Sequence, residues 1–296
     1  MKNKSKILIL VTDGHVGGVQ SFLLQRFKWV CSDRLRVIAT SDGRCCEEFR
    51  ARGVDTRVVS KLQFMLLGFW LLRSSQNKYV ICNSTFMGLA GRLFCAFRRQ
   101  KVIYISHGWG VSYNSAGLKP LTYLMERWLS KVTHRIWCVS QRDFEFAIND
   151  LRIDPKKLSI LNAEQFSYTA ASPNVENICV VMRDAYPKRY DLVSLLAREF
   201  PTVKFHCFGA DRPSSENILY YGIVDQVPYA DFDAAMLLSD SEGYPMVAVE
   251  AARNGIPIFM LDLPINKQLE KNGILVKTLD RENLINSFGA FVSNNG

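Results

Sequence analysis

Two glutamates stand eight residues apart in the stretch LLSDSEGYPMVAVEAARNGIPIFM, residues 237–260. Glu242 lies in a short polar loop after an apolar strand, and Glu250 lies in the helix that is predicted to follow. Pro245 suits the first turn of that helix, and Gly255 suits the left-handed position just past its end. Unpaired N–H groups at a helix N-terminus attract phosphate, whereas carboxylates accept hydrogen bonds from sugar hydroxyls. The pattern therefore predicts a site for a phosphate-activated sugar.

Two cations complement this pair. Arg183 and Lys188 follow the apolar stretch ENICVVM, which is predicted to be the first strand of the C-terminal half. A leaving diphosphate accumulates negative charge, and without a metal that charge must meet fixed cations and N–H donors. The planar fork of Arg and the point charge of Lys both suit phosphate oxygens. Both cations are therefore candidate phosphate ligands.

The elements that position these residues alternate between strand and helix. Apolar runs such as KILILVT and KVIYIS are typical of buried parallel strands, and amphipathic segments separate them. Two successive series of this kind predict an α/β protein with two Rossmann-like domains that face a central cleft. The polar, Ser- and Pro-containing stretch 163–177 contains the predicted boundary. The expected domains are residues 1–165 and residues 166–296.

The segment SEGYPMVAVEAARNGIPI resembles the Glu-x7-Glu signature of the retaining family-4 glycosyltransferases with the GT-B fold. Other segments resemble elements of the same family: GHVGGVQSF its Gly-Gly loop, SHGWG its His-Gly element, and VVMRDAYPKRYDLV its Gly-Arg…Lys-Gly-aromatic-Asp element. WCVSQRDFEFAIN and KKLSILNAEQF are similar to two further elements. Ala163, Met182 and Arg189 stand where the family has glycine, so the backbones of those loops are expected to differ.

The resemblance implies a role for each matching residue. Glu250 would bind the ribose hydroxyls of the donor, Glu242 its sugar, and Arg183 with Lys188 its diphosphate. His107 would approach the transferred sugar. The predicted catalytic set is Glu242, His107, Arg183 and Lys188, and the predicted donor-binding set adds Gly17, Gly18, Gly243, Tyr244, Pro245, Met246 and Glu250. The resemblance also implies that the anomeric configuration is retained through a front-face, oxocarbenium-like transition state.

A metal-dependent reaction is not expected. Asp231 and Asp233 have the Asp-x-Asp spacing by which another class of glycosyltransferase binds Mn²⁺ or Mg²⁺, but they precede a strand, where turn or capping duty is favoured. The histidines form no ligand spacing with acids or cysteines. We expect no metal and no cofactor, with the nucleotide-diphosphate sugar as substrate.

Charge and composition bear on partners and compartment. Residues 1–165 carry 26 Lys and Arg against 12 Asp and Glu, whereas residues 166–296 carry 11 against 16. A basic N-terminal half favours an anionic partner such as phospholipid headgroups or a phosphorylated glycolipid, although a merely soluble basic surface is the alternative. No recognised nucleic-acid-binding motif appears, so nucleic acid is not expected.

The most apolar run, residues 61–73, is too short to cross a bilayer. We expect a buried helix there, with a helix in the membrane interface as the alternative. The eight cysteines show no Cys-x-x-Cys spacing and favour reduced, mostly buried thiols. The predicted location is cytoplasmic, with peripheral attachment to the inner face of the cell membrane as an option.

Three rival functions stay open at this point. In a dinucleotide-dependent oxidoreductase, Gly14, Gly17 and Gly18 would form the phosphate loop and Asp42 would bind ribose. That assignment fails the Gly-x-Gly-x-x-Gly spacing and leaves the two glutamates unexplained. A GT-B hydrolase or epimerase would turn over nucleotide sugar without an acceptor. A non-catalytic partner of another transferase would bind donor without releasing nucleotide.

The sequence therefore predicts a retaining, metal-independent glycosyltransferase of hexosyltransferase type. Its donor is expected to be a UDP-sugar in preference to a GDP-sugar. Its acceptor is expected to be a glycan or glycolipid in the synthesis of a bacterial surface polysaccharide such as lipopolysaccharide or capsule. Many relatives in the resembled family carry further C-terminal helices beyond the point that corresponds to residues 281–291, so a compact version or a supporting partner is expected.

Overall fold

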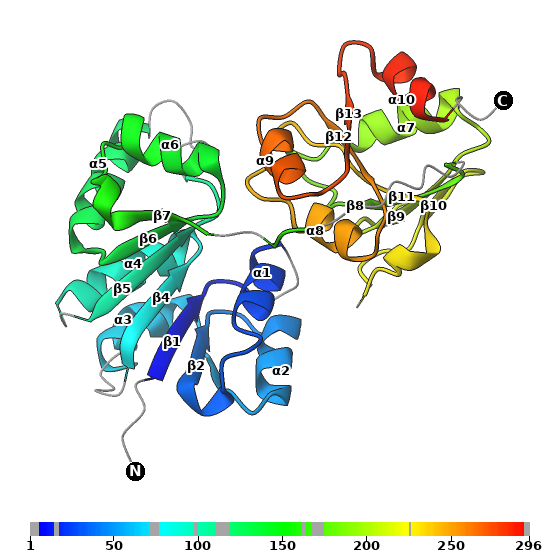
Figure 1. The fold of residues 1–296 in the computed structure, drawn as a ribbon. Helices are drawn as coiled ribbons and strands as arrows, with labels where there is room; N and C mark the ends of the chain where they lie inside the picture. Colours follow the sequence, from blue (N-terminus) through cyan, green and yellow to red (C-terminus); the bar gives the residue numbers. More distant parts are fainter. Residues whose placement is uncertain are drawn as a thin grey trace. The chain divides into compact units, whose positions relative to one another are not determined.

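The computed structural model describes residues 6–14, 18–71, 77–97, 100–109, 119–161, 164–166, 175–224 and 226–292. The chain divides into two compact units, residues 1–161 and residues 162–296, here called the N-terminal and C-terminal units (Figure 1). This division falls four residues before the boundary predicted from the sequence. Residues 164–166 belong to the C-terminal unit, where the N–H of Phe166 donates to the carbonyl of Asn272 at 2.8 Å.

The N-terminal unit is built on a parallel sheet. Within the described residues the sheet has seven strands in the order β3-β2-β1-β4-β5-β6-β7. Its central strands are continuous apolar runs because both faces are covered, and Leu8, Ile9 and Leu10 are fully buried. The strands are β1 (Lys6–Val11), β2 (Leu35–Ala39), β3 (Asp55–Val58), β4 (Asn77–Asn83), β5 (Lys101–Ser106), β6 (Arg135–Cys138) and β7 (Leu158–Ile160).

Helices cover both faces of this sheet. The strand order reverses direction between β1 and β4, and right-handed crossovers therefore place α1 and α2 on one face and α3 to α6 on the other. Helices α3 and α5 each contact α4, so these three lie side by side on the second face (Figure 1). The helices are α1 (Gly18–Arg26), α2 (Arg44–Ala51), α3 (Lys61–Leu71), α4 (Thr85–Ala96), α5 (Lys119–Val132) and α6 (Gln141–Asn149), with short 3₁₀ turns at Ser32–Arg34 and Pro155–Lys157.

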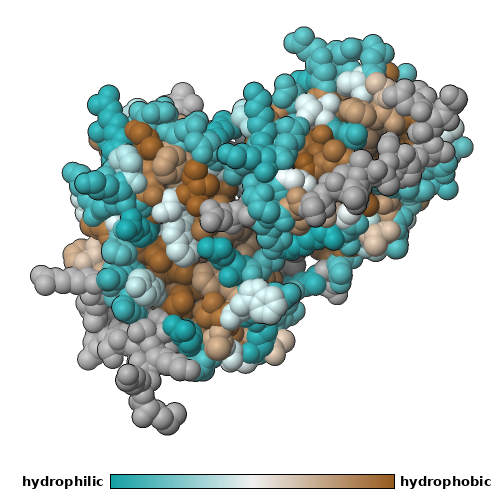
Figure 2. All heavy atoms as spheres, viewed as in Figure 1, coloured by the Kyte–Doolittle hydropathy of each residue, from teal (hydrophilic) through white to brown (hydrophobic). Residues whose placement is uncertain are grey.

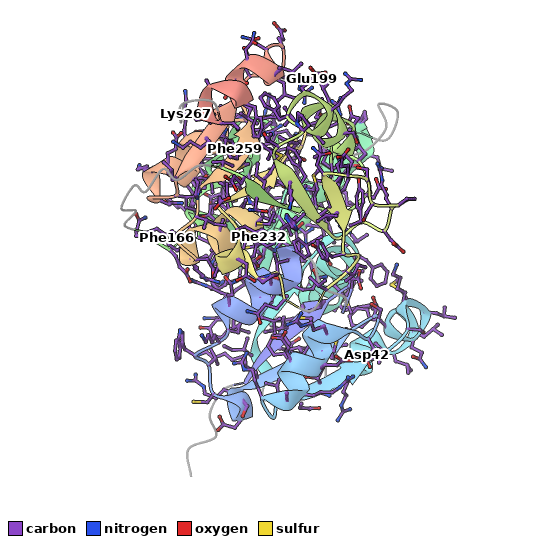
Figure 3. All side chains as sticks on the ribbon, turned by 90° about the vertical axis from the view of Figure 1, so that its right-hand side faces the viewer. Asp42, Phe166, Glu199, Phe232, Phe259 and Lys267 are labelled. Atoms are coloured by element: carbon purple, nitrogen blue, oxygen red, sulfur yellow. The ribbon has the colours of Figure 1, made fainter. Side chains whose placement is uncertain are left out.

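The C-terminal unit repeats the plan. Its described part forms a six-stranded parallel sheet in the order β10-β9-β8-β11-β12-β13. The strands are β8 (Asn177–Val181), β9 (Lys204–Phe208), β10 (Ile218–Tyr220), β11 (Ala234–Leu237), β12 (Ile258–Leu261) and β13 (Val276–Leu279). The helices are α7 (Tyr190–Glu199), α8 (Met246–Arg253), α9 (Asn266–Lys271) and α10 (Leu284–Val292), with a 3₁₀ turn at Tyr229–Asp231. Its core includes the edge-to-face pair of Phe259 on β12 and Phe288 on α10, whose ring centroids lie 5.2 Å apart; Phe259 is labelled in Figure 3.

The structure corrects one expectation about elements. Helix α3 is not buried: Phe64 is inside, but Leu62 and Leu66 are 69% and 70% exposed. Before the final helix, Asp280 accepts a hydrogen bond from the N–H of Glu282 in a turn. The expectation for the cysteines is confirmed, since all eight are free thiols and only Cys31 is exposed.

Candidate functional site

The strand order of the C-terminal unit creates a switch point between β8 and β11, where ligands of doubly wound sheets bind at the carboxyl ends of the strands. The loops after these two strands are joined to each other. Lys188 and Ser239 form an isolated antiparallel bridge. The N–H of Arg189 donates to the carbonyl of Leu238 at 3.0 Å, and the N–H of Asp240 donates to that of Pro187 at 2.9 Å. Residues about fifty positions apart in sequence are thereby held in one place.

Lys188 and Glu242 form an ion pair at this junction. Both side chains are mostly buried, with 18% and 12% of their surface exposed. The sequence predicted each of them as a ligand contact, one for phosphate and one for sugar hydroxyls, but not their pairing. Because the pair is largely shielded from water, each partner holds the side chain of the other in place in the absence of ligand. A diphosphate that entered here would meet an ammonium already fixed in position.

Arg183 differs from Lys188. Its side chain is exposed, and it makes no hydrogen bond or ion pair with the described part of the chain. The neighbouring Arg189, at a family glycine position, is instead held by Asp191 and by Asp240, the latter at 3.1 Å. Asp240 also pairs with Arg281. The ion pairs of Asp240 with Arg189 and Arg281 hold this loop in place, and Arg183 takes no part in them.

Helix α8 begins beside this loop. Pro245 is its N-cap residue, with an extended backbone and no side-chain cap, so the helix starts one residue later than Pro245. A proline at this place donates no hydrogen bond, and the first-turn N–H groups are uncapped by any side chain. Met246 is buried, and Gly243 and Tyr244 are partly exposed. Gly255 takes the predicted left-handed position, with φ of +72°.

Glu250 lies one turn into α8 and accepts a hydrogen bond from the hydroxyl of Tyr229 at 2.8 Å. Burial raises the pKa of the Glu250 carboxyl, while the Tyr229 hydrogen bond and the charge of Arg253 oppose that rise. Sequence reasoning missed Tyr229, which precedes the Asp-x-Asp pair by two residues. A tyrosine beside a turn gives no local sign of a carboxylate partner twenty-one positions away.

The end of α8 is tied to the segment that enters the unit. Arg253 pairs with Glu164, and the amide of Asn272 donates to the hydroxyl of Tyr244 at 3.1 Å. The amide of Gln165 in turn donates to the side-chain oxygen of Asn272. Tyr244 is therefore held from the α9 side. Residues Asn162 and Ala163, part of a family-like element, lie outside the described residues.

Asp231 lies in the 3₁₀ turn Tyr229–Asp231, and Asp233 has a structural role. The carboxylate of Asp233 accepts hydrogen bonds from the N–H groups of Glu176 and Asn177 at 3.0 and 2.8 Å. It fastens the start of β8 to the start of β11. Among the described residues, no group of three or more His, Cys, Asp or Glu side chains is placed to hold a metal ion.

In the N-terminal unit, His107 directly follows β5, and its side chain is partly exposed although its Nε2 atom is buried. Its Nε2 atom has no hydrogen-bond partner within the described residues, and its ring meets Phe22 edge-on with centroids 5.2 Å apart. Burial lowers the pKa of His107 to about 4, so the imidazole is neutral at physiological pH. Gly18 begins α1, and Gly17 lies outside the described residues.

Asp143 of α6 holds the loop that follows His107. It accepts a hydrogen bond from the Ser140 hydroxyl at 2.9 Å, and its backbone carbonyl accepts one from the Trp109 indole at 2.9 Å. Burial raises the pKa of the Asp143 carboxyl to about 6, although hydrogen bonds from Ser140 and the Gly108 backbone oppose the rise. Asn83 and Ser106, at the ends of β4 and β5, also have buried side-chain atoms without partners in the described part. Sequence reasoning missed both residues.

The oxidoreductase alternative finds no support in the first βαβ unit. Asp42, its candidate ribose ligand, is bound by both terminal nitrogens of Arg50 at 2.9 and 3.1 Å; Figure 3 labels Asp42. Gly14 packs too closely on the backbone of Ser41 and Asp42 for any larger residue, since a Cβ there would lie 2.5 Å from the Ser41 carbonyl oxygen. This glycine thus serves strand-end packing.

Comparison with known proteins finds similarity to glycosyltransferases. No family model matches the chain. It is 28% identical over 298 residues to the O-antigen biosynthesis glycosyltransferase WbnH of Escherichia coli, covering 95% of this chain and 87% of that one. It is 22% identical over 324 residues to the E. coli UDP-Gal:alpha-D-GlcNAc-diphosphoundecaprenol alpha-1,3-galactosyltransferase, covering 92% and 84%.

Among solved structures, Anabaena Alr3699/HepE in complex with UDP and glucose superposes with a TM-score of 0.80 at 15% identity, covering 98% of this chain and 90% of that one. The lipopolysaccharide outer core galactosyltransferase WaaB superposes with a TM-score of 0.64 at 14% identity, covering 97% and 90%. These likenesses confirm the predicted GT-B fold. The relatives of this chain are glycosyltransferases, which supports the prediction that the chain is a transferase. In the part of the chain that the structure describes, no helix has the length and apolar character to span a membrane.

Proposed function

We propose that this chain is a retaining glycosyltransferase that moves a sugar from a nucleotide-diphosphate donor to a glycan or glycolipid in bacterial surface polysaccharide synthesis. The observation that carries the proposal is the junction of the loops after β8 and β11. At this one switch point it gathers Lys188, Glu242 and the start of α8. The O-antigen relatives support the biological setting.

In the proposed reaction, the bond between the anomeric carbon and the donor phosphate breaks, and a bond from that carbon to the acceptor oxygen forms on the same face. The acceptor proton passes to the departing phosphate oxygen, so atoms and charge balance without a protein nucleophile. Arg183, Lys188 and the first amides of α8 stabilise the charge that develops on the diphosphate. No metal and no cofactor enter this scheme.

The remaining predicted residues bind and orient the donor. The carboxylate of Glu250 can accept both hydroxyls of a ribose, with Tyr229 holding it in place. Glu242 is positioned by Lys188 to accept hydroxyls of the sugar. His107 is neutral, so it serves as a hydrogen-bonding group and not as a cation. Gly17, Gly18 and residues 243–246 complete the proposed donor contacts.

The donor and acceptor are proposed by analogy with two of the comparisons. HepE was solved with UDP and with UDP-glucose, which favours a UDP-sugar over a GDP-sugar. The relative named for a diphosphoundecaprenol acceptor favours a polyprenyl-diphosphate glycolipid. Such an acceptor lies in a membrane, so we place the enzyme on the cytoplasmic face of the cell membrane as a peripheral protein.

A transfer assay tests this proposal. The full chain is first screened for a thermal shift with UDP-, GDP- and ADP-sugars, because a ligand bound to the native state alone raises the melting temperature. The stabilising donor is then incubated with GlcNAc-diphospholipid, with and without EDTA, and the product is examined by mass spectrometry and NMR. We expect nucleotide release that requires the acceptor, survives EDTA and gives an α-linked product from an α-linked donor.

Other outcomes identify the rivals. Nucleotide release without an acceptor would indicate a hydrolase, and a changed free sugar nucleotide would indicate an epimerase. Donor binding without release at any acceptor would indicate a non-catalytic partner of another transferase. An inverted linkage would overturn the retaining assignment and leave the transferase assignment standing.

A further inference from the structure

Helix α5 buries polar residues and exposes several of its large apolar ones. The side that packs on the unit carries Leu129 and three polar residues, with Thr122, Glu126 and Ser130 buried at a spacing of four. The side that faces outward carries Leu121, Leu124 and Trp128, which are 66%, 63% and 50% exposed. A surface helix normally buries its apolar stripe. The outward stripe of α5 therefore suits surroundings other than water.

The buried polar face is fully accounted for by internal contacts. Arg92 of α4 donates to both carboxylate oxygens of Glu126 at 2.8 and 3.0 Å, and Arg92 also lies over the ring of Tyr104 at 4.0 Å. This paired charge cluster fixes the rotation of α5 about its axis. A rotation of the helix that buried Leu124 and Trp128 would separate Glu126 from the buried Arg92. A buried charge without a partner would cost several kcal/mol of stability. The apolar residues are thus held outward by the fold.

Other helices of the same layer also expose apolar residues. Helix α3 exposes Leu62, Met65, Leu66 and Leu67, and Phe97 at the end of α4 is 78% exposed. Helices α3, α4 and α5 lie in one layer over the same face of the sheet. Figure 2 shows hydrophobic residues at the surface of the N-terminal unit. We call the surface formed by α3, α5 and Phe97 the apolar face.

Positive charge borders this face. On α5 the exposed residues beside Leu124 and Trp128 are Arg127 and Lys131. The only acid in α5 is the buried Glu126, and α3 has none. A hollow of about 630 Å³ is lined by the apolar residues Leu124 and Trp128 and by four cations, Arg127, Lys131, Arg152 and Lys157, together with Ser130 and Asp154.

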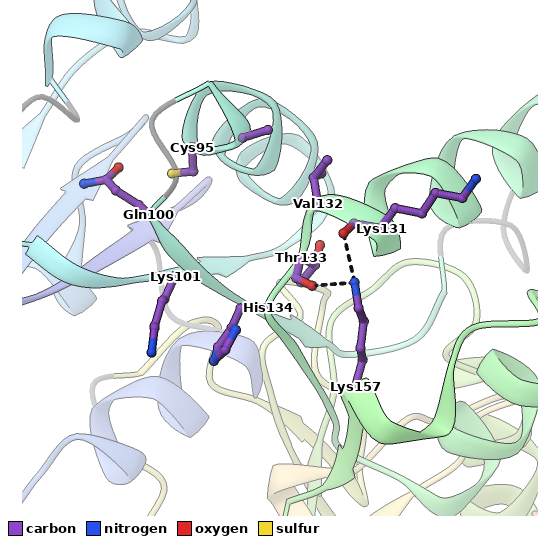
Figure 4. Close-up of a pocket in the computed structure, with 9 residues that line it drawn as sticks. Cys95, Gln100, Lys101, Lys131, Val132, Thr133, His134 and Lys157 are labelled. Carbon is purple, nitrogen blue, oxygen red and sulfur yellow. Dashed lines mark hydrogen bonds between the residues drawn. The ribbon is translucent and has the colours of Figure 1, made fainter.

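A second hollow of about 370 Å³ adjoins the end of α5. Lys101, Lys131, His134 and Lys157 line it, together with neutral residues (Figure 4). Lys157 has a structural duty there, since its ammonium donates to the carbonyls of Ser130, Lys131 and Thr133. Partial burial and the nearby charges of Lys101, Arg135 and Lys157 lower the pKa of His134. The cations at this end of the unit thus outnumber the acids.

We propose that the apolar face of the N-terminal unit docks on a bilayer that contains anionic phospholipid, with Leu121, Leu124 and Trp128 entering the interface. Arg127, Lys131 and Arg152 then contact headgroup phosphates at the hollow beside Trp128. Protein surfaces that bind at the membrane–water interface are typically rich in Trp and Leu with Arg and Lys beside them. A protein partner is less favoured because four of the five charged residues that line the hollow are cations, which matches an anionic lipid surface. The proposed glycolipid acceptor supplies only the biological reason for this docking.

Vesicle flotation tests the inference. The full chain is mixed with vesicles of phosphatidylcholine and phosphatidylglycerol in equal parts, or of phosphatidylcholine alone. We expect binding to the mixed vesicles and at least roughly tenfold weaker binding to the neutral ones. The double variant Leu124→Gln/Trp128→Gln keeps good helix formers on an exposed surface and is expected to lose roughly tenfold or more of the binding. Arg127→Glu/Lys131→Glu is expected to lose a similar amount.

Two matched controls make the result specific. Trp29 follows α1 and is even more exposed than Trp128, at 86% against 50%, so Trp29→Gln should bind as the wild type does. Arg198 is a highly exposed cation in the C-terminal unit, so Arg198→Glu should also bind normally. The inference is overturned if the α5 variants bind like the wild type, if the controls lose as much as they do, or if the wild type ignores lipid and self-associates.

Donor binding is measured on the same variants by thermal shift. The α5 variants are expected to keep the wild-type shift with a UDP-sugar, because no α5 residue belongs to the proposed donor site. Loss of donor binding in every protein, with flotation intact, would reject the proposed function and leave the docking surface standing. Intact donor binding without flotation would reject only the docking surface.

Discussion

At the scale of single residues, Lys188, Glu242 and Glu250 already have partners before a ligand arrives, whereas the Arg183 side chain has none among the described residues. Lys188 neutralises Glu242, Tyr229 donates to Glu250, and Asp240 holds Arg189. Such pairing orders each side chain in advance, so that donor binding does not have to pay the conformational entropy of ordering it. It also separates the two proposed phosphate ligands, because Lys188 is fixed and Arg183 is exposed. Their substitution should therefore have different consequences.

We expect Glu250→Ala to weaken donor binding and Arg183→Ala to slow transfer. Loss of a charged hydrogen bond to ribose should raise the KM for donor roughly tenfold to a hundredfold. Loss of a cation that faces the developing diphosphate charge should lower kcat by about a hundredfold to a thousandfold. Steady-state kinetics on both variants measure these effects. Wild-type kinetics in both would refute the site assignment.

His107 and Asp143 should make stability depend on pH with opposite signs. The pKa of His107 falls from 6.5 to about 4 on folding, so its contribution is present above pH 6.5 and is lost as the pH drops toward 4. The pKa of Asp143 rises from 3.8 to about 6, so its contribution is present below pH 3.8 and is lost as the pH rises toward 6. Each effect is worth about 3 kcal/mol of unfolding free energy.

The two effects offset each other in the wild type, and single variants should reveal them. Between about pH 6.5 and pH 4.5, Asp143→Asn should lose stability on acidification more steeply than the wild type, and His107→Gln should lose less or gain. Urea unfolding at both pH values gives the slopes. Parallel slopes for all three proteins would mean that neither group is buried as described.

At the scale of elements, local signals predicted the strand–loop–helix unit around α8 well. Pro245 and Gly255 mark its limits, and the apolar strands on both sides were plain in the sequence. The sequence reasoning assigned no element to Asn266–Lys271 or Val276–Leu279, which form α9 and β13. These elements are too short to show a helical or strand-like hydrophobic period in the sequence. β13 forms because it pairs with β12 at the edge of the sheet.

Helix α3 shows why hydrophobicity alone could not settle burial. A run of apolar residues reads the same whether it packs inside or faces a membrane. The contacts of Lys188 with Glu242 and of Tyr229 with Glu250 could not be predicted from the sequence for another reason. Each joins residues from different loops, and only the strand order at the switch point brings those loops together.

Gly273, which follows α9, should be far less tolerant than Gly255, which follows α8. Both have positive φ, +79° and +72°. A Cβ at Gly273 would lie 1.8 Å from the carbonyl oxygen of Phe166, whereas a Cβ at Gly255 meets nothing within 4 Å. Gly255→Ala should cost about 1 kcal/mol of unfolding free energy from backbone strain, and Gly273→Ala several kcal/mol more by displacing residues 164–166. Equal denaturation midpoints would contradict the packing of Phe166, which is labelled in Figure 3.

At the scale of the whole molecule, charge divides the proposed tasks. The basic N-terminal half carries the apolar face and the cationic hollows, and the acidic C-terminal half carries most of the proposed donor contacts. A membrane-bound acceptor and a soluble donor would thus be served by different units of one chain. The GT-B fold was predictable from the alternation of strands and helices and from the family-like segments, because each of these signals lies within a short contiguous stretch of the sequence.

The most direct test of the central claim is a crystal structure of the full chain soaked with the UDP-sugar that gives the largest thermal shift. The account predicts a diphosphate within hydrogen-bonding distance of Arg183, Lys188 and the first amides of α8, and ribose hydroxyls on Glu250. A well-ordered nucleotide anywhere else, with Lys188 and Glu242 untouched, would contradict it.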